Sequence, residues 1–303
     1  MDEKVYVTKH IEDGCSCAPI FASQVHLSQI LCNEQGSIPL ICPFKVVTAD
    51  NEKPQVELIE SGPGVNYVAI SHIWSDGLSN VNENSIPQCQ FNRLSRLVGN
   101  LYDGTQMPFW LDTLCFPLQP TEAYNLALIG MRKTYEEAHK VLVLDRYLQE
   151  QEAKHLTLDE IVTRIVCSPW NRRLWTLQEG ALAKSLAFQF ADDFVDLSDN
   201  LTRGSEKEAR LGDLVFSNIW VSFMELRAIE LRDSKVLNAP AAKSALAFRS
   251  TSVASDEALC LGTLLGLDPA EIVNTPTEDR MKKIWSLEPE YYAATVFWTG
   301  PKL

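Results

Sequence analysis

Short apolar runs alternate with longer amphipathic segments through the middle of the chain. Compact runs rich in Val, Ile, Leu and aromatic residues predict strands at 67–72, 107–112, 140–145 and 185–190. Apolar residues at helical spacing predict helices at 88–102, 121–139, 157–168 and 172–184. Thr121 is a candidate N-cap, and Thr157 with Glu160 has the spacing of a capping box. This alternation predicts βαβ units, and therefore an α/β fold with a parallel sheet, flanking helices and right-handed crossovers.

The segments on either side of this alternation have a different pattern. Before it, residues 25–36 have the apolar spacing of a short helix and residues 38–47 predict a strand. After it, periodic apolar residues predict helices over 213–231 and in the later part of 245–268. We expect three parts, which are an N-terminal lead-in packed on the core (1–62), an α/β core (63–195) and a helical C-terminal region (196–303). The chain ends at Leu303 without an evident finishing element, which fits a truncated C-terminal region.

The composition of the chain indicates which kinds of binding partner and which cellular location to expect. The 303 residues are 46% hydrophobic and 22% charged, as in ordinary globular domains. The formal net charge of −13 argues against broad nucleic-acid binding and against an anionic membrane surface, because both need basic protein surfaces. No apolar run approaches the ~20 residues of a membrane span, and the charged start MDEKVYVTKH lacks the apolar segment of a secretion signal. We therefore expect a cytosolic or nuclear protein, with the cytoplasm as the predicted location.

The eight cysteines are expected to be reduced thiols, because disulfide frameworks are typical of small secreted chains. His10, Cys15 and Cys17 lie close together, and further Cys and His residues follow at His26, Cys32 and Cys42. Paired Cys and His at short spacing are typical of zinc sites. A C-x-C pair without a second tight pair also fits thiols that pack as small apolar groups. The sequence leaves both interpretations open.

Chemistry-bearing residues follow two of the predicted strands. Ser71, His72 and Trp74 stand at the end of strand 67–72, and Asp112 and Cys115 stand at the end of strand 107–112. Open parallel sheets bind ligands at the carboxyl ends of their strands, so these side chains are candidates for one crevice. The alternatives are a histidine that packs in the core and an aspartate that bonds to its own turn. A third possibility is a Cys115 nucleophile with His72 as its base.

Another candidate group lies on the predicted helix 172–184. Trp175 and Glu179 are four residues apart and therefore share one helical face, and Arg172 and Arg173 precede them. Glu179 is either solvated or held against an indole at a pocket wall, where burial would perturb its protonation or let it bind sugar hydroxyls. The two arginines are either solvated or bind a phosphate or a carboxylate.

Three common catalytic signatures are absent from the sequence. It contains no G-x-G-x-x-G, no G-x-x-x-x-G-K-[ST] and no G-x-S-x-G. Hydride transfer on the usual dinucleotide fingerprint, P-loop hydrolysis and the α/β-hydrolase mechanism therefore lose most of their support.

Three sequence blocks occur in a fixed order, YVAISHIW at 67–74, WLDTLCFPLQ at 110–119 and RLWTLQE at 173–179. Together they resemble the fungal heterokaryon incompatibility (HET) domain. The second block is one residue longer than the common pattern, which shifts Gln119, and the first has His72 where many members have Tyr. Arg249, Ser252 and Asp256, followed by LCLGTLLGLD, resemble the tail of the same proteins. The H-x4-C-x-C start is similar to the lead-in of some members.

The resemblance implies a fold and a chemistry. HET domains are similar to TIR domains, whose sheet is parallel and flavodoxin-like, and NAD-cleaving TIR domains carry a Glu four residues after a Trp on a helix before a late strand. Trp175 and Glu179 match that arrangement. The implied reaction is loss of nicotinamide from NAD through an oxocarbenium-like transition state, with Glu179 as the key carboxylate. NAD is then a substrate, and no resident cofactor is implied.

The resemblance also implies how the substrate is held. Trp74 or Trp175 would stack on an aromatic ring, and backbone N–H groups of residues 73–80 would meet the pyrophosphate. The candidate substrate-binding residues are Ser71, His72, Trp74, Asp112, Cys115 and Arg173.

Two function classes stay open at this point. One is a TIR-like NAD hydrolase that self-association activates and that triggers cell death. The other is a self-associating signalling module whose crevice is inert and which meets other incompatibility or signalling proteins. A weaker third alternative is other small-molecule chemistry with Cys115 and His72.

Overall fold

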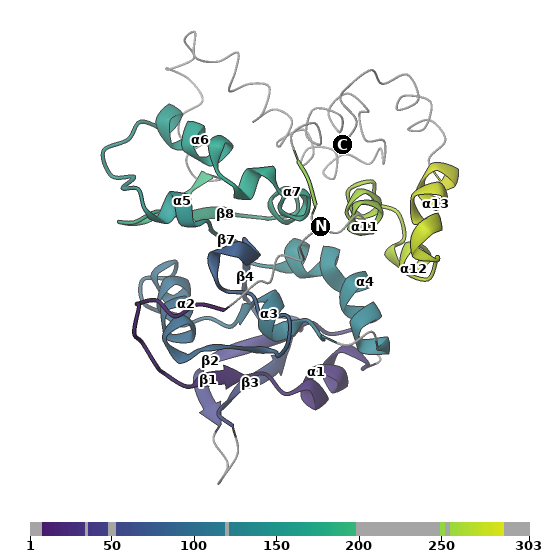
Figure 1. The fold of residues 1–303 in the computed structure, drawn as a ribbon, viewed down its shortest axis with the longest axis horizontal. Helices are drawn as coiled ribbons and strands as arrows, with labels where there is room; N and C mark the ends of the chain where they lie inside the picture. Colours follow the sequence, from purple (N-terminus) through teal and green to yellow (C-terminus); the bar gives the residue numbers. More distant parts are fainter. Residues whose placement is uncertain are drawn as a thin grey trace. The chain divides into compact units, whose positions relative to one another are not determined.

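The computed structural model describes residues 8–33, 36–47, 53–118, 121–197, 249–251 and 255–287 (Figure 1). These residues fall into two compact units. The first contains the chain up to Lys154 and resumes at Ala183, and the second contains residues 155–182 and the described residues from 249 onward. Gln119, Ser252 and the predicted helix over 213–231 lie outside the described residues.

The first unit is built on one mixed sheet, in which the described strands have the order β5-β1-β3-β2-β6-β4-β7-β8-β9. The strands are β1 (Pro19–Phe21), β2 (Pro39–Val47), β3 (Gln55–Glu60), β4 (Val68–His72), β5 (Ser85–Pro87), β6 (Phe109–Trp110), β7 (Lys140–Leu144), β8 (Leu186–Gln189) and β9 (Phe194–Asp196). The four strands β6, β4, β7 and β8 are mutually parallel, and β2 and β9 flank them as antiparallel neighbours. The predicted α/β class is confirmed.

The parallel strands have the spatial order second, first, third and fourth along the chain, as in the beginning of a flavodoxin-like sheet. β4 lies between β6 and β7, and all five of its residues are buried. It pairs with β7 from Val68 opposite Lys140 to His72 opposite Leu144. The connections that leave β4 and β7 diverge, and this divergence creates the switch point at which such sheets bind ligands.

Helices cover the sheet of the first unit. They are α1 (Gln24–Leu31), α2 (Gln88–Asn100), α3 (Asp112–Cys115), α4 (Glu122–Glu137) and α5 (Arg146–Gln149), with a 3-10 turn η1 (Trp74–Asp76). α2 leads from β4 to β6, and α4 leads back from β6 to β7, so right-handed crossovers place them on opposite faces. α1 packs on α4 (Figure 1). Thr121 caps α4 as predicted, because its hydroxyl accepts the N–H of Tyr124.

The second unit is helical among its described residues. Its elements are α6 (Leu158–Cys167), η2 (Trp170–Arg172), α7 (Leu174–Ala181), α11 (Asp256–Leu264), α12 (Pro269–Val273), η3 (Thr277–Asp279) and α13 (Arg280–Leu287). The predicted capping box of Thr157 and Glu160 is present at the start of α6. α11 packs against α7 and also contacts α12 and α13. A Cβ at Gly262 would lie only 2.0 Å from Cδ1 of Ile272, so this glycine permits the close approach of α11 and α12.

Two element boundaries next to candidate residues differ from the sequence prediction. The strand predicted over 107–112 ends at Trp110, and Asp112 begins the short helix α3. The reason is local, since the carboxylate of Asp112 accepts the N–H of Thr113 at 2.6 Å. The helix predicted from residue 172 begins at Leu174, because Arg173 is extended and forms a parallel bridge with Ser250.

Candidate functional site

A carboxylate joins the ends of two parallel strands in the first unit. Oδ1 of Asp112 lies 2.7 Å from Nε2 of His72, and Oδ2 accepts the indole N–H of Trp74 at 2.6 Å. His72 ends β4, whereas Asp112 follows β6, so the contact crosses two neighbouring strands. The structure therefore brings together three of the predicted residues at the carboxyl edge of the sheet.

The charge of Asp112 is stabilised by its partners. Burial acts to raise the pKa of this carboxyl, but the charge and hydrogen bond of His72 outweigh it, and Trp74 and the N–H of Thr113 add to the effect. The resulting pKa is about 2. Asp112 is therefore a carboxylate at neutral pH and unsuited to donate a proton there. Its geometry suits a residue that holds the imidazole and the indole in fixed orientations.

The loop after β4 is tied down at several points. Ser79 donates its hydroxyl to the carbonyl of Trp74 at 2.8 Å, and Thr113 donates to the carbonyl of Leu78 at 2.9 Å. Gly77 has a φ of +95°, and its carbonyl accepts the N–H of Lys9 at 2.9 Å. A side chain at Gly77 would meet Cβ of Lys9 at 2.7 Å. The N-terminal segment thus lies directly against the loop that carries Trp74.

Acidic side chains lie after both β4 and β7, and the one after β4 joins the two segments. Asp76 accepts the backbone N–H of Arg146 at 2.9 Å. Asp145 is fully buried and caps α5 by accepting the N–H of Leu148 at 3.2 Å. The backbone N–H groups of Arg146 and Leu148, in the first turn of α5, therefore have carboxylate partners within the chain.

Ser71 and Cys115 occupy buried positions in the first unit. Ser71 lies within β4, opposite Val143 of β7, and is 1% exposed. Burial raises the pKa of the Cys115 thiol to about 12, and the nearby charge of Asp112 acts in the same direction. Cys115 lines a cavity of about 290 Å³ together with Trp110, Phe116 and residues of α4. A protonated thiol in this setting is a poor nucleophile at neutral pH.

In the second unit, α7 carries Trp175 and Glu179 one helical turn apart. The indole N–H of Trp175 donates to Oδ2 of Asp256 at 2.9 Å. Asp256 is the first residue of α11, and burial raises the pKa of its carboxyl, while its bond to Trp175 and the charges of Arg280 and Arg173 oppose the shift. The charge of Arg173 thus acts on the carboxyl of Asp256, and its binding of a phosphate or of a carboxylate such as Glu179 stays a prediction.

Glu179 is nearly buried and has a cationic neighbour. It is 8% exposed, and its charge interacts with that of Arg249, which is 6% exposed. Arg249 donates to the carbonyl of Arg173 at 3.0 Å and to Oδ1 of Asn171 at 2.5 Å. Burial lowers the pKa of Arg249 to about 10, so the guanidinium stays charged at neutral pH. The solvated alternative for Glu179 is therefore wrong.

The block at 173–179 and the distant Arg249 and Asp256 meet in the structure. Arg249 also reaches the hydroxyl of Thr176 at 3.3 Å, which adds a third contact with the segment leading into α7. Gln178 of the same block is fully buried, and neither atom of its amide has a hydrogen-bond partner among the described residues. Gln178 belongs to the block at 173–179, but a glutamine between Leu177 and Glu179 gives no signal of its burial in the sequence.

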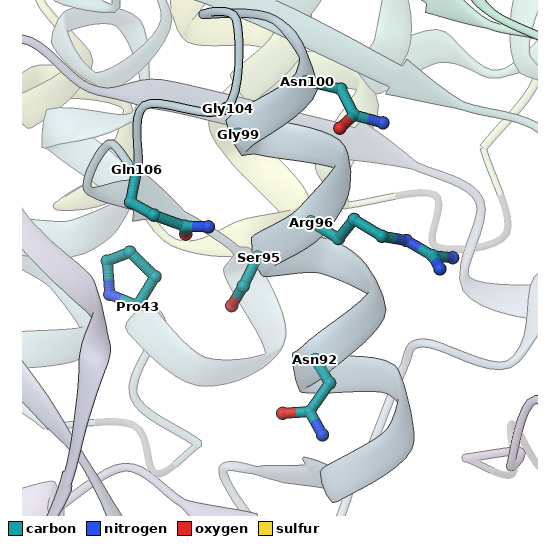
Figure 2. A pocket seen from close by; sticks show the side chains of 8 residues that line it. All are labelled: Pro43, Asn92, Ser95, Arg96, Gly99, Asn100, Gly104 and Gln106. Atoms are coloured by element: carbon teal, nitrogen blue, oxygen red, sulfur yellow. The ribbon is translucent and has the colours of Figure 1, made fainter.

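One further cavity lies away from all of these residues. It has a volume of about 450 Å³ and is a hollow beside α2 in the first unit (Figure 2). The residues that line it are Pro43, Asn92, Ser95, Arg96, Gly99, Asn100, Gly104 and Gln106. Gln106 lies over Gly99, where a Cβ would meet its Nε2 at 3.3 Å (Figure 2). The hollow contains none of the predicted site residues.

A group of potential metal ligands lies in the N-terminal part of the first unit. One ligand atom from each of His10, Cys15, Cys17 and Cys89 lies within 4.8 Å of the others. The first three are the candidates predicted from the sequence, and Cys89 at the start of α2 is new. His26, Cys32 and Cys42 do not belong to this group. Cys89 is 72 residues from Cys17, so spacing along the chain gave no signal for it.

Comparisons with known proteins give no further information about the family or function of this chain. No family model, curated protein or solved structure matches this chain. Among the described residues, every helix is too short or too polar to cross a membrane.

Proposed function

We propose that this chain is a signalling domain of the HET type that releases nicotinamide from NAD, with Glu179 as the key carboxylate. One observation carries the proposal. Glu179 is a nearly buried acid one turn after Trp175, on the last described helix before β8, which is the last parallel strand of the sheet. The flavodoxin-like strand order supports the same assignment.

The reaction consumes water and gives nicotinamide, ADP-ribose and a proton. Cleavage of the bond between ribose and nicotinamide builds positive charge on the ribose carbon and its ring oxygen. A fixed carboxylate in a water-poor setting stabilises that charge more than one in bulk solvent. Glu179 is 8% exposed, which is the setting that this role requires. The charge of Arg249 interacts with that of the carboxylate.

The direct test is nicotinamide release by purified protein over a range of protein concentrations. We expect turnover in wild type, a rise in specific activity with concentration, and loss of turnover in Glu179→Gln. Glu257→Gln is the matched control, because Glu257 is a half-buried carboxylate of α11 in the same unit. Circular dichroism and thermal melts establish that both variants are folded. Turnover that survives in folded Glu179→Gln contradicts the catalytic assignment.

Ligand binding by the first unit is a separate part of the proposal. Trp74 is half-buried, and its indole N–H is held by Asp112, so the ring has a fixed position at the carboxyl edge of the sheet, where we propose that it stacks on an aromatic base. We expect nucleotide binding, measured by calorimetry, to weaken in Trp74→Ala by ~1–3 kcal/mol, the usual worth of one stacked base. Equal nucleotide affinities of wild type and Trp74→Ala would show that Trp74 does not bind the nucleotide.

A second candidate function is a self-associating module without catalysis. It is favoured by the buried charge interaction between Glu179 and Arg249, since a paired carboxylate can have a purely structural role. This candidate predicts no turnover at any concentration, together with a mass that rises with concentration in light scattering. It also predicts that Glu179→Gln changes stability rather than chemistry.

A further inference from the structure

Four side chains from two distant segments converge next to the sheet edge in the first unit. His10, Cys15 and Cys17 belong to the segment before β1, and Cys89 belongs to the first turn of α2. All four are half-buried, and their ligand atoms lie within 4.8 Å of one another. We propose that this cluster is a structural zinc site of the Cys3His type. The proposal is independent of the proposed function.

The spacing of the four atoms suits zinc. Tetrahedral ligands at about 2.3 Å for sulfur and about 2.0–2.1 Å for nitrogen lie about 3.5–3.8 Å from one another. Nδ1 of His10 lies 3.3 Å from Sγ of Cys17 and 3.6 Å from Sγ of Cys89. These two distances are within a few tenths of an ångström of tetrahedral spacing, and the remaining distances, which are at most 4.8 Å, need to shorten by about 1 Å at most. Cys3His is also one of the common ligand sets of structural zinc.

The fold builds the cluster from backbone contacts that need no metal. A turn with Gly14 at a φ of +87° brings the N–H of Cys15 to the carbonyl of Glu12 at 3.2 Å. β1 then pairs antiparallel with β5, and the N–H of Gln88 bonds to the carbonyl of Ala18 at 3.0 Å. This pairing places the segment that ends in Cys17 beside the start of α2. The ligands are therefore positioned by the sheet and by a turn.

A backbone N–H of α2 is directed at one thiol of the cluster. The backbone N–H of Cys89 donates to Sγ of Cys17 at 3.3 Å. Such N–H donors stabilise metal-bound thiolates, and the first turn of a helix favours negative charge. Three thiolates and a neutral imidazole around Zn²⁺ leave one net negative charge, and binding releases the thiol protons. Four protein ligands leave no position for substrate, so the metal has a structural role.

The proposed metal would stabilise the loop that carries Trp74. Residues 8–10 follow that loop closely, since Thr8 donates to the carbonyl of Ser79 at 2.6 Å and Lys9 bonds to the carbonyl of Gly77. The side chain of Gln90 donates to the carbonyl of Lys9 at 3.0 Å. A metal ion bound by both His10 and Cys89 would therefore hold residues 8–10 between α2 and the loop.

The test is metal content, followed by spectroscopy. The full chain is expressed in zinc-supplemented medium, purified under reducing conditions and analysed by mass spectrometry of its metals. We expect about one zinc per chain in wild type and in Cys32→Ser, whose cysteine is exposed and outside the cluster. We expect Cys89→Ser to lose its zinc to a chelator at a concentration that wild type withstands.

A second readout avoids dependence on a variant that fails to fold. Wild type reconstituted with Co²⁺ should show the thiolate charge-transfer and ligand-field absorption of tetrahedral coordination. Removing the metal should speed hydrogen exchange in residues 8–17 and 77–90 and leave β7 unchanged. Wild type that takes up neither zinc nor cobalt overturns the proposal, as does Cys89→Ser that holds zinc as tightly as wild type.

Discussion

Protonation of Asp112 should destabilise the first unit at low pH by an amount that the structure sets. The carboxyl accepts hydrogen bonds from Trp74 and Thr113 and contacts His72, and these interactions lower its pKa from 3.8 to about 2 in spite of burial. At about 1.36 kcal/mol per pKa unit, the shift corresponds to about 2 kcal/mol of stability. Because the pKa is depressed in the folded state, this stability is present above pH ~4 and is lost as pH falls through the folded value. We expect a loss of about 1 kcal/mol by pH 3.

The assay is urea denaturation of wild type and Asp112→Asn at pH 7 and pH 3. At pH 7 the variant should unfold about 2–4 kcal/mol more easily, because it loses the charge that His72 and Trp74 bond to. At pH 3 the gap between the two proteins should shrink by about 1 kcal/mol, since wild type has then lost part of the same stabilisation. Other acids titrate equally in both proteins and cancel in this comparison. Glu122→Gln, on the exposed start of α4, controls for removal of a surface charge. A gap that stays constant between pH 7 and pH 3 refutes the reasoning.

Other predictions concern packing and reactivity. Arg249→Met should lower the free energy of unfolding by about 3–5 kcal/mol in urea titrations, and Glu179→Gln in the same chain should recover part of that loss if the two charges are coupled. Gly77→Ala should be destabilising by more than Gly104→Ala, since both have positive φ but only Gly77 faces Lys9; equal melting temperatures would contradict the close contact. Under native conditions Cys115 should resist alkylation that labels the exposed Cys32 and Cys167, because it is buried and its pKa is raised to about 12, and peptide mass spectrometry measures this.

The parts of the fold that were predictable are those with strong local signals. β4 and β7 are buried apolar runs, and Thr121 and the pair Thr157 and Glu160 are helix starts that hydrogen-bond as their types require. β1, β5 and β9 have three residues each, which is too few for a period to show. β3 did carry a signal, because Val56 and Leu58 alternate with less buried positions, and this strand was missed.

The candidate sites also combine features that local sequence signals predict with contacts that they do not predict. His72 and Trp74 were predicted because they stand at the end of a strand. Their contacts with Asp112 depend on the order of the strands in the sheet, which the spacing of residues along the chain does not specify. The contacts of Arg249 with the segment before α7 span 76 residues from Arg173 and require tertiary packing. Cys89 joined the metal-ligand cluster for the same reason. Local patterns therefore predicted which residue types stand at element ends, and long-range packing decided their partners.

The sheet of the first unit is completed late in the chain, and this has a consequence for synthesis on the ribosome. β7 ends at Leu144, but its neighbour β8 begins only at Leu186, after the helices of residues 155–182. Until β8 arrives, β7 presents an apolar open edge, which is the kind of surface that pairs with other chains. The final edge strand β9 has three residues, and its Asp196 is held by Lys140 at 2.8 Å. A nascent chain that pauses before residue 186 would therefore be prone to aggregation, and emergence of β8 and β9 would end that exposure.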